Sequence, residues 1–302
     1  MRLGVQVNTG GLSAEAIVGQ VRAVAAAGLD SVYFNQVQSW DAISLAMLSA
    51  AQVPDIAVGT AVTPTYPRHP IALASQALTA QAASGNRFTL GLGPSHKPII
   101  EEQFGYSYER PARHVREYLS ALMPLLRGEE ADFHGDTVTA AGRVEVPGAR
   151  PPSVLLAALG PVMLKIAGEL ADGTVTVWTG PQTIAGHIAP SVTRAAADAG
   201  RPAPRVVASI IVVRTADPAA TRDRIAATAG AAGQFASYRL LLERQGMSGI
   251  QETAVVGDER VIEAAVRAYA EAGATELVAS LHGSEQDRAG TLELLSALHR
   301  PG

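Results

Sequence analysis

Short apolar runs alternate with longer segments of helical periodicity along almost all of the 302 residues. Eight of these runs have the length and the β-branched content of buried strands, and a helical pattern follows each of them. The runs are residues 2–7, 31–34, 56–62, 87–92, 154–158, 174–178, 205–213 and 276–281. Strand–helix alternation predicts a parallel sheet with its helices outside. Eight such units favour a closed α/β barrel, the TIM (β/α)8 fold, over an open doubly wound sheet.

Capping residues support several helix boundaries. Ser13 and Asp258 stand where an N-cap is expected, and Gly28 and Gly273 stand where those two helices should end. Pro70 fits the first turn of a helix, where its missing N–H leaves no hydrogen bond unmade. The other helices are expected over residues 41–51, 111–128, 161–170, 184–199 and 291–298.

Two segments interrupt the alternation. Residues 129–152 are polar, contain glycines and include short alternating stretches, and they predict a hairpin. Residues 218–249 include a long alanine-rich helical stretch from Pro218 to Arg244. We therefore expect a single domain over residues 1–302 with insertions near 129–152 and 218–249.

Charge and composition exclude several classes of function. The net charge of -4 and the pI near 6.0 do not provide the basic surface that nucleic acids require. No apolar run approaches the roughly 18 residues of a membrane span, and the N-terminus does not resemble a signal peptide. We expect a cytoplasmic protein with no nucleic-acid or membrane partner. The chain has no cysteine, and its 7 histidines form no His-Glu-x-x-His pattern, so no metal is expected.

In a barrel, ligands bind where the strands end and the loops lead into the helices. Among these loops, Ala158–Pro161 ends a strand, contains a glycine and starts a helix whose free amides attract phosphate or another anion. An ordinary tight turn is the alternative. Residues 59–64 run through small residues into a proline-rich turn, and a plain strand end is the alternative there. The loops to consider are 8–11, 35–40, 60–69, 93–102, 158–162, 178–181 and 282–284.

Two side chains at strand ends could contact a ligand ring. His96 follows the fourth strand and is either a catalytic or ring-contacting histidine or a solvated loop residue. Trp178 either lines a cofactor ring or fills the barrel mouth. Gly91 and Gly93 do not form a dinucleotide fingerprint, because His96 stands where the third glycine belongs. The chain has no Gly-Lys-Ser/Thr phosphate loop and no Gly-x-Ser-x-Gly nucleophile elbow.

Four stretches, in order, resemble the luciferase-like monooxygenase superfamily, and within it the oxidoreductases that depend on the deazaflavin coenzyme F420. They include VGTAVTPTYPRHP and LLAALGPVMLKIAG and cover residues 58–96, 108–129, 155–178 and 255–280. The resemblance implies coenzyme F420 at the barrel mouth, with FMN as the alternative cofactor. It also implies a homodimer, since relatives are often dimers.

The resemblance assigns roles to individual residues. In this family the third strand ends in a bulge with a non-prolyl cis peptide bond behind the cofactor ring, and here that bond would join Ala61 and Val62. The phosphate site of the family matches residues 159–162, and its two excursions over the substrate pocket match residues 129–152 and 218–249. The cofactor-binding residues that we expect are Asn8, Asn35, Thr60, Ala61, Val62, Gly93, Pro94, Ser95, Ala158, Leu159, Gly160, Pro161, Val162 and Trp178.

The chain departs from its relatives at the positions that handle protons. Many relatives carry an acidic residue and a histidine after the second strand, where this chain has Asn35 and Gln36, which can hydrogen-bond but cannot supply a proton. Glu101 is only a loose counterpart of a carboxylate that some relatives place after the fourth strand. The candidate catalytic residues are therefore His96, as proton donor, and Asn35.

The leading functional hypothesis is hydride transfer between the deazaflavin and a small carbonyl, enone or alcohol substrate. The first alternative keeps the fold but uses reduced FMN and oxygen, as a monooxygenase. The second is a barrel that binds a cofactor without catalysis, and the third is a metal-dependent barrel hydrolase. Binding of each cofactor, turnover and metal content would separate these four.

Overall fold

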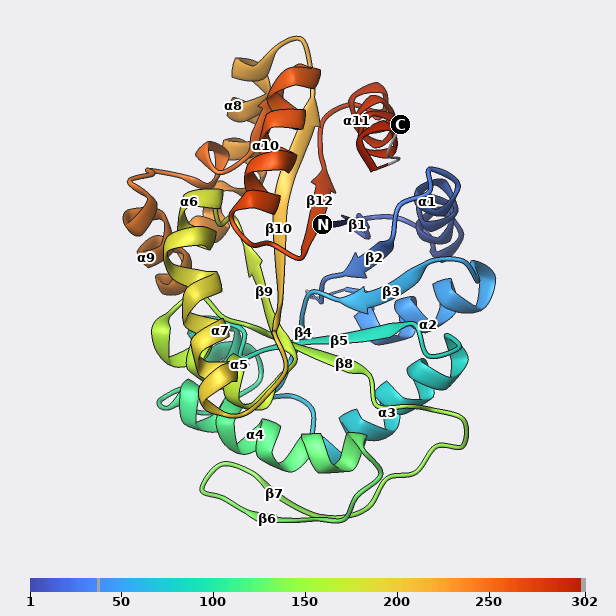
Figure 1. Cartoon of the computed structure of the whole chain (residues 1–302), viewed down its shortest axis with the longest axis vertical. Helices are drawn as coiled ribbons and strands as arrows, with labels where there is room; N and C mark the ends of the chain where they lie inside the picture. The colour runs from blue at the N-terminus through green and yellow to red at the C-terminus, as the bar shows by residue number, and fades with distance from the viewer. Residues whose placement is uncertain (37–38, 300–302) are drawn as a thin grey trace.

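The computed structural model describes residues 1–36 and 39–299, and these form a closed barrel of parallel strands surrounded by helices (Figure 1). Each barrel strand pairs with the next in the order given below, and the circle closes because β12 also pairs with β1. This arrangement confirms the predicted TIM (β/α)8 fold. The strands are β1 (Arg2–Gln6), β2 (Ser31–Phe34), β3 (Ala57–Thr60), β5 (Phe88–Gly93), β8 (Ser153–Ala157), β9 (Gly173–Val177), β10 (Arg205–Arg214) and β12 (Glu276–Leu281).

The helices begin at the capping residues that the sequence indicates. Ser13 Oγ accepts from the amide of Ala16 at 3.2 Å, and Asp258 Oδ1 accepts from the amide of Val261 at 3.1 Å. No helix among the residues described is long and apolar enough to cross a bilayer. The outer helices are α1 (Ala14–Ala26), α2 (Ala42–Gln52), α3 (Pro70–Ala83), α4 (Pro111–Leu126), α5 (Pro161–Leu170), α7 (Ala189–Asp198), α10 (Glu259–Glu271) and α11 (Glu285–His299).

The last helix starts six residues earlier than the expected residue 291, because its cap lies further upstream. The amide of Asp287 donates to Ser284 Oγ at 3.1 Å, while Asp287 Oδ2 accepts from the amide of Ser284 at 2.9 Å. This reciprocal pair is a capping box with aspartate as its acidic partner.

A buried charge network closes the barrel at the N-terminal ends of its strands. The Glu276 carboxylate is 1% exposed and accepts from Arg205 Nη2 at 2.7 Å and from Tyr33 Oη at 3.2 Å. Above this layer, the barrel interior is filled by Tyr33, Leu155, Val175, Val207 and Val278. The C-terminal ends of the strands lie at the opposite end of the barrel, which we call its mouth and where ligands bind in this fold.

The first insertion is the predicted hairpin, formed by the antiparallel strands β6 (Ala131–His134) and β7 (Thr139–Gly142). It lies outside the barrel beside α4, at the lower edge of Figure 1. The Glu117 carboxylate of α4 fixes its turn by accepting from the amide and the hydroxyl of Thr137, each at 2.7 Å. The hairpin therefore packs along α4, and its turn residues Asp136 and Thr137 line a cavity together with Tyr66 and Tyr106 from the strand-end loops.

The second insertion differs from the single long helix expected over Pro218–Arg244. It contains two helices, α8 (Pro218–Ala229) and α9 (Ala236–Gln245), separated by a tight helical turn at Gly230–Gln234 and by Phe235 in an extended conformation. The two glycines in this turn weaken the helix locally. A short strand, β11 (Val255–Gly257), follows and pairs with β10.

Candidate active site

Small apolar residues line the mouth on the side of β3, β5 and β8. A Cβ on Gly93 would lie 2.9 Å from Val62 Cγ2 and 3.2 Å from Ala157 Cβ, so only glycine fits there without displacement. Ala61, Val62 and Ala157 pack against the interior cluster of the barrel. We call Ala61, Val62, Gly93 and Ala157 the apolar wall.

The bulge behind this wall has the predicted form. The bond between Ala61 and Val62 is a non-prolyl cis peptide. The amide of Ala61 donates to the Phe34 carbonyl at 2.8 Å, and Thr60 Oγ1 donates to the Gly91 carbonyl at 2.8 Å. Thr60, one of the expected binding residues, is fully buried, and its hydroxyl is already hydrogen-bonded. It therefore supports the wall only through its backbone in the strand.

Polar side chains line the opposite side of the mouth, on β1, β10 and β12. β12 lies four strands from β5 in either direction around the circle, which places these side chains across the mouth from the apolar wall. Ser209 Oγ donates to Gln6 Oε1 at 3.0 Å, and Gln6 stands beside Ser280 in the strand register. Ser280 Oγ lies 3.1 Å from His282 Nε2. We call Gln6, Ser209, Ser280 and His282 the polar wall.

His282 is half-buried at the end of β12, where it continues the series of inward-facing positions 278 and 280. Burial lowers the pKa of His282, and the nearby charge of Arg288 lowers it further. A histidine with a lowered pKa is neutral at pH 7 and can both donate and accept a hydrogen bond. Residues 282–284 were predicted to form a strand-end loop, but no functional role was predicted for any of them.

The second insertion covers part of the mouth with aromatic rings. Phe235 stacks on His96 with ring centroids 4.0 Å apart and planes 3° apart. The Tyr238 ring packs edge-on against His96 at 4.8 Å and against Trp178 at 4.7 Å. We call His96, Trp178, Phe235 and Tyr238 the aromatic roof.

Ser95, next to this roof, and Trp178, within it, adopt a backbone conformation that residues other than glycine rarely adopt. The φ angle is 61° at Ser95 and 53° at Trp178, both in the left-handed region. Hydrogen bonds hold both turns: Tyr108 Oη donates to the Ser95 carbonyl at 2.7 Å, and Gln245 Nε2 donates to the Trp178 carbonyl at 3.0 Å. Backbone in this region concentrates at functional sites, where the surroundings fix it.

His96, the expected proton donor, belongs to this roof. Burial lowers its pKa, so the ring is neutral at pH 7. One face of the imidazole is covered by Phe235. This position fits the ring-contacting role considered from the sequence better than proton transfer to a substrate.

The two expected asparagines differ in availability. Asn8 is exposed, and its Oδ1 accepts from the amide of Gly10 at 3.1 Å, which shapes its own loop. Asn35 is half-buried just beyond β2, and its side chain has no hydrogen-bond partner within residues 1–36 and 39–299. The adjacent Gln36 Oε1 is engaged with the amide of Ala42 at 3.1 Å and with Arg68 at 3.2 Å. Of these two amides, Gln36 is held by its neighbours, and Asn35 is unpaired within the described residues.

The turn from β8 into α5 is open to solvent. A Cβ on Gly160 would meet no atom within 4 Å, and Val162 is 60% exposed. The first turn of α5 has no side-chain cap, so the amides of Val162 and Met163 lack partners inside the helix. Ala158, by contrast, is 2% exposed and packs in the layer under the helices. The open helix start thus comprises residues 160–163, and the buried Ala158 side chain does not reach it.

In the described part of the chain, no group of three or more His, Cys, Asp or Glu residues gathers. The arrangement instead combines a flat apolar surface, an open helix start and a polar wall. This combination suits a phosphorylated ring compound beside a small polar substrate.

Comparison with known proteins agrees with this geometry. The sequence pattern of the family described as luciferase-like monooxygenase matches residues 1–276. A 5,10-methylenetetrahydromethanopterin reductase of Methanolobus tindarius is 31% identical over 149 residues, which are 49% of this chain and 45% of the reductase. A Mycobacterium tuberculosis protein named as a candidate coenzyme F420-dependent oxidoreductase is 28% identical over 268 residues, 84% of this chain and 75% of that protein. The match to the reductase thus spans less than half of its length.

A solved structure has the same fold. An F420-dependent secondary alcohol dehydrogenase, in complex with an F420–acetone adduct, superposes with a TM-score of 0.84 at 15% identity, covering 99% of both chains. The family resemblance predicted from the sequence is confirmed by the match over residues 1–276. The chain belongs to the luciferase-like monooxygenase family.

Proposed function

We propose that the chain transfers a hydride between bound coenzyme F420 and a small organic carbonyl, enone or alcohol. The observation that carries this proposal is the two-sided mouth, in which the apolar wall faces the polar wall across the barrel. The apolar wall suits one face of a flat ring, and the polar wall suits a substrate oxygen on the other face. The F420-dependent names of the mycobacterial relative and of the superposed dehydrogenase support the choice of cofactor.

The residues of the mouth fit a phosphorylated deazaflavin. Val62, Gly93 and Ala157 would support the back of the ring, because no side chain protrudes at position 93. The open first turn of α5, residues 160–163, would hold the phosphate through backbone amides. When bound, the cofactor supplies the hydride or receives it in the reverse direction.

The polar wall would take up or return the proton that moves when an alcohol and a carbonyl interconvert. His282 is neutral at pH 7 because burial lowers its pKa. Ser280 lies against its Nε2 atom, which leaves Nδ1 to face a substrate oxygen. In alcohol oxidation, the neutral Nδ1 of His282 would accept the hydroxyl proton as the hydride leaves the carbon, and in carbonyl reduction the protonated imidazole would return a proton to the same oxygen. Asn35 would donate a second hydrogen bond to that oxygen.

The aromatic roof would keep water from the reacting atoms. Phe235 and Tyr238 belong to the segment around α9, and their rings lie over His96 and Trp178. Exclusion of water strengthens the hydrogen bonds of the polar wall. In this proposal His96 contacts the ring and does not transfer the proton.

Cofactor titration tests the proposal. Purified protein would be mixed with coenzyme F420 and, separately, with FMN, and binding followed by fluorescence quenching. Turnover of ketones, enones and alcohols would then be followed by the absorbance of the deazaflavin. We expect saturable F420 binding and reduction of at least one carbonyl class. Tight FMN binding without F420 binding would refute the proposal.

One alternative deserves its own test because of the family's description as monooxygenases. An FMN-dependent monooxygenase would consume oxygen in the presence of reduced FMN and substrate, which an oxygen electrode measures. Saturable binding of a cofactor without turnover of any substrate class would instead indicate a protein that only binds the cofactor.

A further inference from the structure

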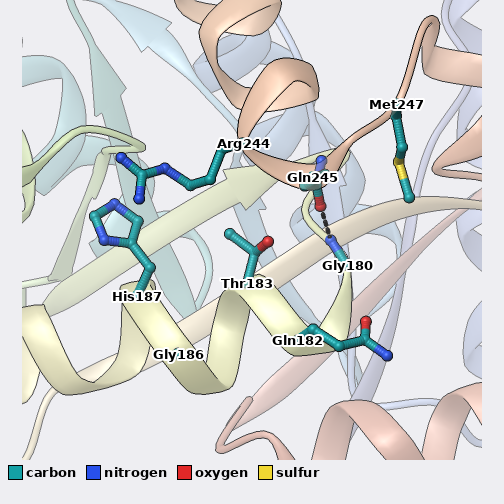
Figure 2. A pocket seen from close by; sticks show the side chains of 8 residues that line it. All are labelled: Gly180, Gln182, Thr183, Gly186, His187, Arg244, Gln245 and Met247. Carbon is teal, nitrogen blue, oxygen red and sulfur yellow. Dashed lines mark hydrogen bonds between the residues drawn. The ribbon is translucent and has the colours of Figure 1, made fainter.

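A cavity of about 420 Å³ lies between α9 and the segment that follows β9 (Figure 2). Arg244 projects from α9 toward the imidazole of His187, which stands on the opposite side (Figure 2). To one side of this pair, Gln245 Oε1 accepts from the amide of Gly180 at 2.6 Å and ties α9 to the segment after β9. Thr183 adds a hydroxyl to the lining. We call this cavity the cationic recess.

The charges of the recess are unbalanced. None of its lining residues is acidic. The Arg244 guanidinium has no hydrogen bond or ion pair with any residue in the described ranges 1–36 and 39–299. An arginine without a counter-ion, in a cavity that no carboxylate lines, favours an anion beside it.

The recess adjoins the expected phosphate site. His187 Nε2 donates to the Leu159 carbonyl at 2.9 Å, which joins the lining of the recess to the residues just before α5. Leu159 directly precedes Gly160, where α5 begins and where the amides of Val162 and Met163 are free. One ligand could therefore place one anionic group at the start of α5 and a second anionic group beside Arg244.

We propose that the cationic recess binds a second anionic group, a carboxylate or phosphate, on the tail of the same cofactor whose phosphate lies at α5. This inference rests on the proposed function, because coenzyme F420 carries carboxylates beyond its phosphate whereas FMN ends at one phosphate. Arg244 provides the bidentate contact, and the Thr183 hydroxyl provides a single hydrogen bond. The recess thus selects a cofactor with an anionic tail.

Binding of two deazaflavins separates this role from ring binding. Wild type and Arg244→Gln would be titrated with coenzyme F420 and with the deazaflavin riboside that lacks both phosphate and tail. Arg239→Gln is the matched control, since Arg239 is an exposed arginine of the same helix with only a 3.9 Å contact to Glu243. We expect Arg244→Gln to weaken F420 binding about tenfold and to leave riboside binding unchanged. The control should change neither affinity.

Three results would overturn the inference. They are an unchanged F420 affinity in Arg244→Gln, an equal loss for both deazaflavins, or an equal loss in the Arg239→Gln control. A free anion is distinguished by thermal unfolding with inorganic phosphate: if Arg244→Gln abolishes phosphate stabilisation but leaves F420 binding intact, the recess serves a separate anion and not the tail. Wild type that binds neither deazaflavin would refute the proposed function itself.

Discussion

Substitution of Gly93 tests the apolar wall most sharply. In Gly93→Ala the new Cβ would lie 2.9 Å from Val62 Cγ2 and 3.2 Å from Ala157 Cβ. Carbon atoms in contact normally stand about 3.5–4.0 Å apart, so Val62 must move by roughly 1 Å. Overpacking of this kind costs about 1–3 kcal/mol of unfolding free energy. The displaced methyl would also disturb the surface on which the ring rests, and we expect at least tenfold weaker F420 binding.

Val62→Ala provides the matched rescue, because it removes the methyl that the new Cβ would meet. Urea unfolding and F420 quenching would be measured for both single variants and for the double variant. We expect the double variant to recover stability and affinity relative to Gly93→Ala, with a coupling energy of about 1 kcal/mol or more. Wild-type stability and wild-type F420 affinity in Gly93→Ala would show that the wall is not where the ring binds.

Three further predictions concern histidines. His282→Asn should lower kcat for ketone reduction about 100-fold with little change in F420 affinity, whereas His96→Asn should lower kcat far less. A larger loss of kcat in His96→Asn than in His282→Asn would assign proton transfer to His96. Phe235→Ala should raise the pKa of His96, because burial lowers that pKa in the folded protein. NMR titration of His96 measures the shift. The control Leu240→Ala, at a 63% exposed position of α9, should leave the pKa of His96 unchanged. Burial lowers the pKa of His114 to about 4, although the charge of Glu117 opposes the shift. Because the unfolded chain binds this proton more readily, the free energy of unfolding should fall by about 2 kcal/mol as the pH drops from 6.5 to 4. Chemical unfolding of wild type and His114→Asn across that range checks this, and parallel curves would contradict it.

The fold could be predicted from the sequence because its signals are local. Each barrel strand is a short apolar run, and caps such as Ser13 and Asp258 hold their helices as expected. The errors occurred where local signals compete. The Ser284–Asp287 capping box was missed, and an alanine-rich stretch with two glycines was interpreted as one helix.

The site divides in the same way. The free amides after Gly160 follow from a strand–glycine–helix pattern, and the cis bond at Ala61–Val62 followed from the family resemblance. The polar wall could not be found locally, because Gln6 and Ser209 are 203 positions apart and meet only when the barrel closes. Its one available signal was the period of two along each strand, which places Ser280 and His282 on the inward face. The position of Phe235 in the aromatic roof could not be predicted, because its segment was expected to be a continuous helix.

A crystal structure of the protein with coenzyme F420 would test the central claim most directly. We predict that the ring will lie against Ala61, Val62 and Gly93, with the cofactor phosphate on the amides of residues 160–163 and the substrate side open to His282. A ring bound elsewhere, or a phosphate away from the start of α5, would contradict it.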